Sequence, residues 1–399
     1  MKSILFIANN CVKNQGLSGG DRIFTELLRH WQSKINLSVI GPIETKQFLS
    51  RCKLNQIRFY LTTKKNLNTN LYSSASLIIH YLFRVFTAIF FILSQYKDIF
   101  KFKYIYSVSD FYPDFLPALF IKLIHPKTSW IAGFYLFAPN PFSSQSPYIV
   151  NHRFFRGLMY YLSQRPAYFL IRTFADIIFI TSAPDKIFFP GKKIVVIQGG
   201  VDITAAKNYQ KSTSQIAWSN KQFDVVYLGR LHFQKGVMEL IDIWKLVLKK
   251  LPAAKLAIIG NGNLESDLKN KIEKLDLQNN IKLFGFLDGQ PKYDIFKNSK
   301  IVVHPATYDS GGMAAAEAMA WGLPGVSFDL ESLKSYYPQG MLKAKCFNFQ
   351  DFANKIYLLL TNNTVYKKQS LLAFNLIHQQ WSWEKRTSEI FNQVFNNIY

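Results

Sequence analysis

Two acidic side chains, Asp309 and Glu317, are the first candidates for chemistry in this sequence, because seven residues separate them across a predicted turn. Ser310–Gly312 is a run of small residues, and the alanine-rich segment after it has a high helix propensity. The β-branched run Ile301–Val303 upstream is typical of a buried strand. This order of strand, glycine turn and helix leaves backbone amides without an internal partner at the helix N-terminus, where a phosphate or another anion is favoured.

We expect this helix end to bind an anionic ligand, because glycine lets the backbone approach a ligand closely. Glu317 lies about one helical turn into the helix and can point toward the same ligand. An alternative from the residues alone is a tight turn in which Asp309 caps the helix and Glu317 is solvated. The residues expected to form the binding turn are Gly311, Gly312, Met313 and Ala314.

A pair of cations forms the second candidate. Arg230 and Lys235 follow the predicted strand Asp224–Leu228 and precede the predicted helix Val237–Leu248. A guanidinium and an ammonium group at the carboxyl end of a strand can meet the two charges of a diphosphate. Without the acidic pair, these two residues would be taken for ordinary surface cations.

Both motifs resemble those of the retaining glycosyltransferases of the GT-B fold, glycosyltransferase family 4 (glycosyl transferases group 1). Asp309 and Glu317, followed by Ala-Met-Ala-Trp-Gly-Leu-Pro, are similar to its acidic-x7-Glu motif, and Gly229 to Gly236 is similar to its Gly-Arg-x4-Lys-Gly. The resemblance implies that the first acid holds hydroxyls of the donor sugar, that Glu317 holds the nucleotide ribose and that the two cations hold the diphosphate. The family usually has Glu in the first place, so the shorter Asp309 leaves the identity of the donor sugar open.

Further contacts follow from the same resemblance. Gly19 and Gly20, after the predicted first strand, would lie beside the donor diphosphate and the acceptor. From the residues alone, a close strand–helix contact explains these glycines equally well. The base would be bound largely by backbone near Phe286, beyond the turn that contains Gly262.

One departure from the family concerns the transferred sugar. The family often places a His after the strand predicted at 130–136, but no His occurs from 126 to 151. Another group must therefore line the site, and Asp110 is the nearest candidate. A helix-capping Asp is its alternative.

Metal-independent transfer is expected, because no Asp-x-Asp occurs in the chain, a pair that metal-dependent transferases commonly need to hold a divalent ion. We expect Arg230, Lys235 and the helix end near Gly312 to stabilise the leaving group instead, without a metal or cofactor. The resemblance implies retention at the anomeric carbon, with the leaving phosphate taking the acceptor proton. The predicted catalytic residues are Arg230, Lys235, Asp309 and Asp110.

Two domains suit a chain of 399 residues. The strand and helix alternation from 224 to 328 indicates a doubly wound parallel sheet. The predicted fold class is α/β, of the GT-B type with two Rossmann-like domains facing a cleft. We expect an acceptor-binding domain at 1–205 and a nucleotide-sugar-binding domain at 206–380, with the linker at 207–221. The segments expected to end the chain are helices at 351–360 and 371–380 and a last helix within 381–399 that packs back on the first domain.

Charge points to an anionic partner, since the net charge is +23. Residues 1–205 hold 24 Lys and Arg against 9 Asp and Glu, a net +15, and residues 206–399 hold 24 against 16, a net +8. Because the basic residues lie singly among aromatics, an anionic membrane surface is favoured over nucleic acid. The three scattered Cys, at 11, 52 and 346, favour a reduced, cytoplasmic setting, and the N-terminus is not typical of a signal peptide.

Two segments of the first domain could contact that surface. Residues 77–93 are apolar except for His80, Arg84 and Thr87, which would form one narrow stripe on a helix. Residues 147–172 mix Arg with Phe and Tyr. Each segment fits either an ordinary helix that packs in the core or a helix at the bilayer surface.

The sequence therefore predicts a retaining hexosyltransferase that uses a nucleotide-diphosphate sugar and a glycan or lipid-linked glycan acceptor. Its expected setting is the synthesis of a cell-surface polysaccharide, lipopolysaccharide or other glycolipid. We expect peripheral attachment to the inner face of the plasma membrane. The alternatives are an inactive GT-B scaffold, a polyanion-binding module, and a GT-B epimerase or phosphorylase.

Overall fold

The computed structural model describes residues 2–10, 18–64, 74–143, 146–150, 152–213 and 215–396, without the side chains of residues 74, 75 and 77. Cys11 and Gly16 lie outside these ranges. The chain divides into two compact units, Met1–Ile197 with Thr387–Tyr399, and Gln198–Arg386.

The first unit is built on a parallel sheet of seven strands with the order β3-β2-β1-β4-β5-β6-β7. Ile4 in the central strand pairs with Leu37 on one side and with Tyr104 on the other. The strands are β1 (Ser3–Ile7), β2 (Asn36–Gly41), β3 (Arg58–Leu61), β4 (Tyr104–Ser107), β5 (Ser129–Gly133), β6 (Ile177–Ile180) and β7 (Lys193–Val196).

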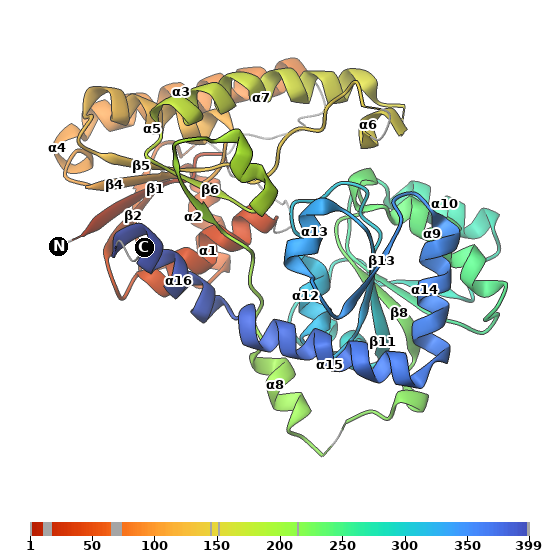
Figure 1. Ribbon diagram of the computed structural model, residues 1–399. Coiled ribbons are helices and arrows are strands. Elements are labelled where there is room, and N and C mark those ends of the chain that lie inside the picture. The colour runs from red at the N-terminus through yellow and green to blue at the C-terminus, as the bar shows by residue number, and fades with distance from the viewer. Residues whose placement is uncertain are drawn as a thin grey trace. The chain divides into compact units, whose positions relative to one another are not determined.

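Helices cover both faces of this sheet. α1 (Gly19–Trp31) and α2 (Ile43–Arg51) connect β1 to β2 and β2 to β3 on one face. The chain then crosses back over β1, and α3 (Ser74–Ser94), α5 (Tyr112–Ile124) and α7 (Phe154–Phe174) cover the opposite face (Figure 1). The short elements of this unit are α4 (Tyr96–Ile99), α6 (Pro147–Val150) and the 3-10 helix η1 (Ala183–Phe188).

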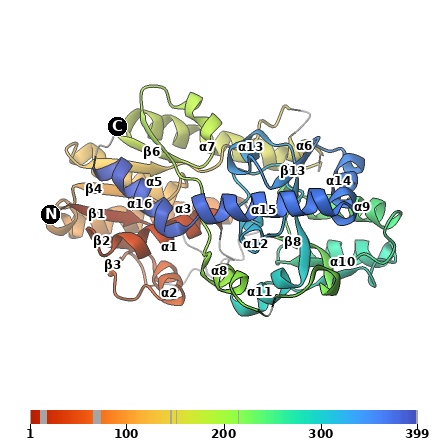
Figure 2. The same ribbon diagram turned by 60° about the horizontal axis from the view of Figure 1, so that its bottom comes forward.

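The last helix of the chain, α16 (Trp383–Phe395), belongs mostly to this first unit. The indole nitrogen of Trp31 donates to the carbonyl of Thr387 at 2.9 Å. The Trp31 ring also meets Phe391 and Phe395 edge-on, at centroid distances of 5.7 and 5.4 Å. These aromatic contacts attach residues 387–395 to the α1 side of the sheet, as both ribbon views show (Figure 2).

The second unit holds a parallel sheet of six strands with the order β10-β9-β8-β11-β12-β13. The strands are β8 (Phe223–Leu228), β9 (Leu256–Ile259), β10 (Ile281–Leu283), β11 (Ser299–His304), β12 (Gly325–Phe328) and β13 (Met341–Ala344). The helices around them are α9 (Val237–Leu248), α10 (Glu265–Lys274), α11 (Gln290–Lys297), α12 (Met313–Met319), α13 (Glu331–Tyr336), α14 (Phe349–Thr361) and α15 (Asn363–Gln380).

The segment 207–221, predicted to be the linker, includes the end of α8 (Thr204–Gln210) and the 3-10 helix η2 (Trp218–Asn220). α8 is held because Tyr209 packs its ring on Trp321 at 5.5 Å and Ala206 is fully buried. The helix expected at 371–380 starts earlier, because the Asn362 side chain caps α15 by accepting from the amide of Val365.

The predicted fold class is confirmed: each unit is an α/β layer structure around a doubly wound parallel sheet. Central strands such as β1 and β8 are buried on both faces, which explains their apolar, β-branched sequences. None of the helices in the described part of the chain has the length and apolar character needed to span a membrane.

Candidate active site

The strand order of the second unit reverses between β8 and β11, which are neighbours in the sheet although β9 and β10 come between them in the chain. In such sheets, ligands bind beyond the carboxyl ends of the strands at this switch point. The loops after β8 and β11 are tied together there, because the carbonyl of Gln234 accepts from the amides of Thr307 at 3.1 Å and Tyr308 at 3.4 Å. This edge of the sheet carries both predicted charge motifs.

Lys235 and Asp309, which the sequence placed on separate motifs, are in direct contact. The Lys235 ammonium lies 2.6 Å from Oδ2 of Asp309, and Nε2 of His304 lies 2.9 Å from the same oxygen. The other carboxylate oxygen accepts from the amide of Ser310 at 2.8 Å. Burial alone would raise the pKa of Asp309, but Lys235 and His304 outweigh it and hold this pKa well below its ordinary value. Asp309 is therefore an anion whose position is set by three neighbours.

Glycine is required at two positions around this contact. Gly236 has φ +66°, and a Cβ there would overlap the carbonyl of Pro305, so only glycine allows the two loops to meet. Gly312 has φ +60°, and a Cβ there would lie 2.7 Å from Nε2 of His304. A side chain at Gly312 would push against the His304 ring that contacts Asp309.

Glu317 forms an ion pair with a lysine, Lys292. The Lys292 ammonium on α11 lies 2.6 Å from Oε2 of Glu317 and 2.9 Å from Oδ1 of Asp288. The Lys292 side chain is only 6% exposed, against 27% for Glu317. Burial opposes the charged form of Lys292, but the two carboxylates more than compensate and raise its pKa. The sequence analysis missed both Lys292 and His304. Only the position of His304 at the end of a buried strand could have indicated a role.

The remaining predicted residues of this unit lie on loops at the same edge of the sheet. The Arg230 side chain is exposed and makes no ion pair with any described residue, while its carbonyl accepts from the hydroxyl of Tyr227 at 3.0 Å. The loop that contains Gly229 is joined to the turn with Gly262 by a bond from the amide of Leu231 to the carbonyl of Asn261, at 2.9 Å. Phe286, after β10, is 54% exposed.

The predicted binding turn is packed from behind. The amide of Gly311 points at Oδ1 of Asp309 at 3.4 Å, and a Cβ on Gly311 would overlap the ring of Tyr336. The hydroxyl of Tyr337 donates to the carbonyl of Gly312. Met313 and Ala314 begin α12 and are half-buried. The turn is thus held rigidly on its inner side.

The first unit has its own switch point, between β1 and β4. Asp114, which the sequence analysis did not single out, accepts from the amides of Asn9 at 2.6 Å and Asn10 at 2.9 Å, and from the hydroxyl of Ser109. Burial raises the pKa of Asp114 to about 7, against the effect of these bonds. Asp114 therefore fixes the loop after β1 against the loop after β4.

Asp110 lies on the second of these loops. Its Oδ2 accepts from Nε2 of Gln164 at 2.7 Å, and the same nitrogen is 2.8 Å from the carbonyl of Leu136. Burial raises the pKa of Asp110 to about 6, and the bond from Gln164 acts in the opposite direction. Gln164, which the sequence analysis also missed, holds Asp110 against the segment after β5 where a His was sought.

Gly19 and Gly20 form the first turn of α1, next to that segment. The helix begins with a capping box in which Ser18 and Asp21 bond to each other's backbone amides. A Cβ on Gly20 would lie 3.4 Å from the ring of Tyr135, whose hydroxyl bonds to that of Tyr106. The structure thus brings the glycine pair and Tyr135 together at the carboxyl edge of the first sheet.

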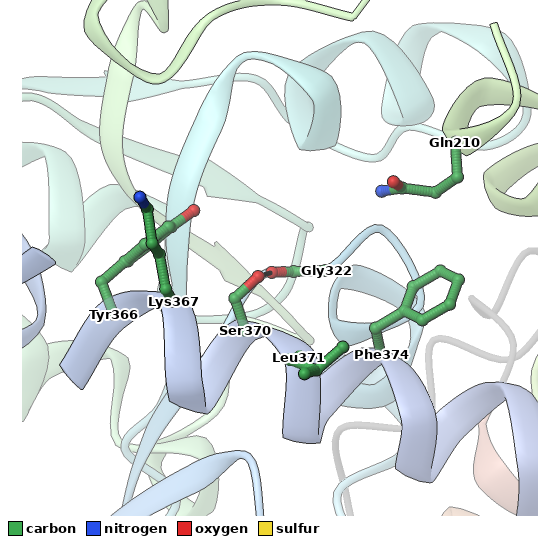
Figure 3. Close-up of a pocket in the computed structure, with 7 residues that line it drawn as sticks. All are labelled: Gln210, Gly322, Tyr366, Lys367, Ser370, Leu371 and Phe374. Atoms are coloured by element: carbon green, nitrogen blue, oxygen red, sulfur yellow. Dashed lines mark hydrogen bonds between the residues drawn. The ribbon is translucent and has the colours of Figure 1, made fainter. Parts of the chain in front are cut away.

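A pocket of about 340 Å³ lies elsewhere in the second unit. Most of its lining residues come from α15 (Figure 3), including Ser370, whose hydroxyl donates to the carbonyl of Gly322 at 2.6 Å. Gly322 follows the C-terminal end of α12, whereas the predicted binding turn precedes that helix. None of the predicted site residues lines this pocket, so we do not assign the chemistry to it.

Comparison with known proteins agrees with this geometry. Residues 208–373 match the family model of the glycosyl transferases group 1. The structure of HepE of Anabaena in complex with UDP-glucose matches 99% of this chain and 100% of its own chain. The sequence identity is 18% and the TM-score is 0.69. A TarM variant of S. aureus, solved with UDP, matches over 99% of this chain and 100% of its own at 14% identity and a TM-score of 0.69. These structures establish the fold.

Curated relatives match only part of their length. A phosphatidylinositol N-acetylglucosaminyltransferase subunit of Schizosaccharomyces pombe is 23% identical over 207 residues, 51% of this chain and 44% of its own. The poly(glycerol-phosphate) alpha-glucosyltransferase of Bacillus subtilis is 26% identical over 161 residues, 39% of this chain and 24% of its own. The chain therefore spans less than half the length of these relatives.

The match to the glycosyl transferases group 1 covers most of the second unit, and the whole chain has the GT-B fold. The resemblance noted in the two charge motifs is thereby confirmed.

Proposed function

We propose that the chain is a retaining, metal-independent glycosyltransferase. It moves a hexose-type sugar from a nucleotide-diphosphate sugar to a glycan or lipid-linked glycan in the synthesis of a cell-surface polysaccharide or glycolipid. The observation that carries the proposal is the contact of Lys235 with Asp309 at the switch point of the second sheet, at 2.6 Å. It joins the two family motifs into one site, and relatives with this domain are named as glycosyltransferases.

The donor occupies the second unit in this proposal. Arg230 and Lys235 bind the diphosphate, and the exposed guanidinium of Arg230 is available for a bidentate contact. Asp309 binds hydroxyls of the sugar and Glu317 those of the ribose, with the base near Phe286. Gly262 and the turn of Gly311, Gly312, Met313 and Ala314 complete the backbone contacts.

In the proposed reaction the main contribution of the protein is to stabilise the charge of the leaving group. The bond between the anomeric carbon and the diphosphate oxygen breaks as the acceptor oxygen bonds to that carbon on the same face. The acceptor proton passes to the departing phosphate oxygen. The two cations stabilise the negative charge that develops on the leaving group, which is the largest effect a site of this kind supplies.

The acceptor is assigned to the first unit, where Asp110, Gly19 and Gly20 lie at the carboxyl edge of the sheet. Asp110 would orient the acceptor or the transferred sugar. The net charge of +15 over residues 1–205 favours peripheral attachment to the inner, anionic face of the plasma membrane, with the protein facing the cytoplasm.

A screen of nucleotide-sugars tests the proposal. We would measure binding by calorimetry and slow donor hydrolysis by release of the nucleoside diphosphate, starting with UDP-sugars because HepE was solved with UDP-glucose. We expect one donor to bind and to hydrolyse slowly, with hydrolysis lost in Arg230→Ala. If no nucleotide-sugar binds, the chain is a scaffold or a polyanion-binding module. If a nucleotide-sugar is converted to its epimer, the epimerase alternative holds.

A further inference from the structure

Helix α3 exposes most of its large apolar residues, while its buried side carries two ionisable residues together with Val85, Ala88 and Ile92. Its buried residues include the ionisable side chains His80 and Arg84, which are 6% and 0% exposed. Its large apolar residues that are 39% to 76% exposed are Ile78, Ile79, Leu82, Phe83, Phe86, Phe90 and Leu93. A helix on the surface of a water-soluble domain normally has the reverse arrangement.

Arg84, on the buried side of α3, is held by contacts within the first unit. The Arg84 guanidinium lies 2.9 Å from Oε1 of Glu44, and both side chains are almost completely buried. The carbonyl of Arg84 accepts from Nδ2 of Asn9 at 2.7 Å. These contacts fix the rotation of α3 about its axis, so its apolar residues are held outward by the fold.

Helix α7 also exposes large apolar residues. Phe155, Met159, Leu162 and Phe169 recur at helical spacing on one side and are 54% to 79% exposed. Both α3 and α7 pack against α5, and all three helices cover the same face of the sheet (Figure 1). The seven residues of α3 and these four of α7 are here called the apolar face. Monomeric proteins rarely expose so many large apolar side chains together unless a partner covers them.

The charged residues around the apolar face indicate what kind of partner covers it. Among the described residues of α3, α5 and α7 the only carboxylate is Asp114, which is buried, while Arg156, Arg165 and Arg172 on α7 are exposed. The first unit as a whole has 24 Lys and Arg against 9 Asp and Glu. Exposed Phe and Leu flanked by Arg, without acids, fit the interface of a bilayer that contains anionic lipid.

We propose that the apolar face inserts into the headgroup region of an anionic bilayer, with α3 and α7 lying along the surface. This rests on the proposed function in one respect, since it makes a lipid-linked glycan the acceptor class. Both helices begin at the carboxyl edge of the sheet, where Asp110 lies, because each follows a strand of a parallel sheet. The ring of Phe111, next to Asp110, packs against Tyr81 of α3 at 6.3 Å. A lipid-linked acceptor would therefore present its glycan close to Asp110.

Vesicle flotation of the full chain tests this directly, with vesicles of phosphatidylcholine alone and of phosphatidylcholine with phosphatidylglycerol. We expect binding to the anionic vesicles. Phe86→Ser with Phe90→Ser should weaken that binding by roughly tenfold or more, since each Phe withdraws a large apolar surface from water. Leu371→Ser is the control, because Leu371 is also a well-exposed apolar residue (61%) but lies in the second unit, and this variant should bind like the wild type.

Salt separates insertion from simple charge attraction. At about 1 M NaCl, where the Debye length falls to about 3 Å, we expect wild-type binding to persist in part and the Phe variant to be released. Arg156→Gln with Arg165→Gln and Arg172→Gln should remove the preference for anionic over neutral vesicles. Unchanged binding by the Phe variant would overturn the proposal. So would a wild-type dimer that the Phe variant breaks, since the face would then join two copies.

The outcome does not depend on catalysis. Slow hydrolysis of the donor takes place on the second unit, so it should be the same in the Phe variant and the wild type. A chain that hydrolyses no donor but binds vesicles through this face would refute the proposed function alone.

Discussion

Lys292 and Glu317, on different helices and 25 residues apart, form a pair at 2.6 Å that orients the acid proposed to bind the ribose. Because Lys292 is almost fully buried, it can act only through Glu317 and Asp288. We infer that Lys292 is a positioning residue for Glu317.

Lys292→Met should therefore weaken binding of the free nucleoside diphosphate by about tenfold, measured by calorimetry. In a Glu317→Gln background the same change should have little further effect, because residues that act as a pair are not additive. Lys269→Met, which breaks an exposed pair with Glu265, is the control and should bind normally. Additive losses in the double variant would mean that Lys292 does not act through Glu317.

Loss of either cation of the site should slow transfer. Arg230→Ala and Lys235→Ala should each lower turnover about 100-fold or more, as removal of one charge-stabilising donor does, with the fold retained by circular dichroism. Lys235→Ala also leaves the buried Asp309 with one partner fewer, so it should lower the melting temperature, whereas the exposed Arg230 should not. Near-wild-type turnover in both variants would remove them from the diphosphate site.

The two acids of the motif should separate in their effects. Glu317→Gln should weaken binding of the nucleotide alone, whereas Asp309→Asn should spare the nucleotide and lower kcat, because the sugar is the only part of the donor that Asp309 contacts in the proposed site. Asn at 309 would also lose the charge that Lys235 and His304 surround. Calorimetry with the nucleotide and steady-state kinetics with the full donor separate the two roles. If the two variants lose nucleotide binding and kcat to the same extent, the proposed roles of Asp309 and Glu317 are wrong.

Activity should depend on pH through Asp110. Its pKa is raised to about 6 by burial, so its carboxylate is half protonated at that pH and turnover should fall as the pH drops below it. Gln164 lowers this pKa by its hydrogen bond, so Gln164→Leu should move the acidic limb of the pH profile upward. Asp110→Asn should remove the limb. If the pH profile of turnover is the same in the wild type, Gln164→Leu and Asp110→Asn, Asp110 has no part in the reaction.

Removal of one member of the buried pair Arg84–Glu44 should destabilise the first unit. Glu44→Leu removes the carboxylate that balances the buried charge of Arg84 and should cost about 3–5 kcal/mol in the free energy of unfolding by urea. Adding Arg84→Met should recover much of that loss, because neither charge then remains buried. Lys101→Met breaks an exposed pair with Asp98 and should change stability by less than about 1 kcal/mol. A small effect of Glu44→Leu would mean that the pair does not hold α3.

The predicted part of the site came from short local patterns. Asp309 and Glu317, and likewise Arg230 and Lys235, lie on single strand–turn–helix segments, so their spacing along the chain already places them near one ligand. The fold class was predictable for the same reason, because the alternation of apolar strands and helices is a local property that requires a parallel sheet. What these patterns lack is information on which segments meet.

Only the tertiary structure decided the partners of these residues. Lys292 contacts Glu317, Gln164 contacts Asp110, and Asp114 contacts Asn9, each across at least 25 residues of chain. The same holds for α3: its sequence shows a polar stripe, but whether the stripe faces water or the core depends on Glu44, which lies on α2, 40 residues before Arg84 in the chain. A buried carboxylate compensates the desolvation of Arg84, and this contact, with the bond from Asn9 to the Arg84 carbonyl, keeps the large apolar residues of the helix outward.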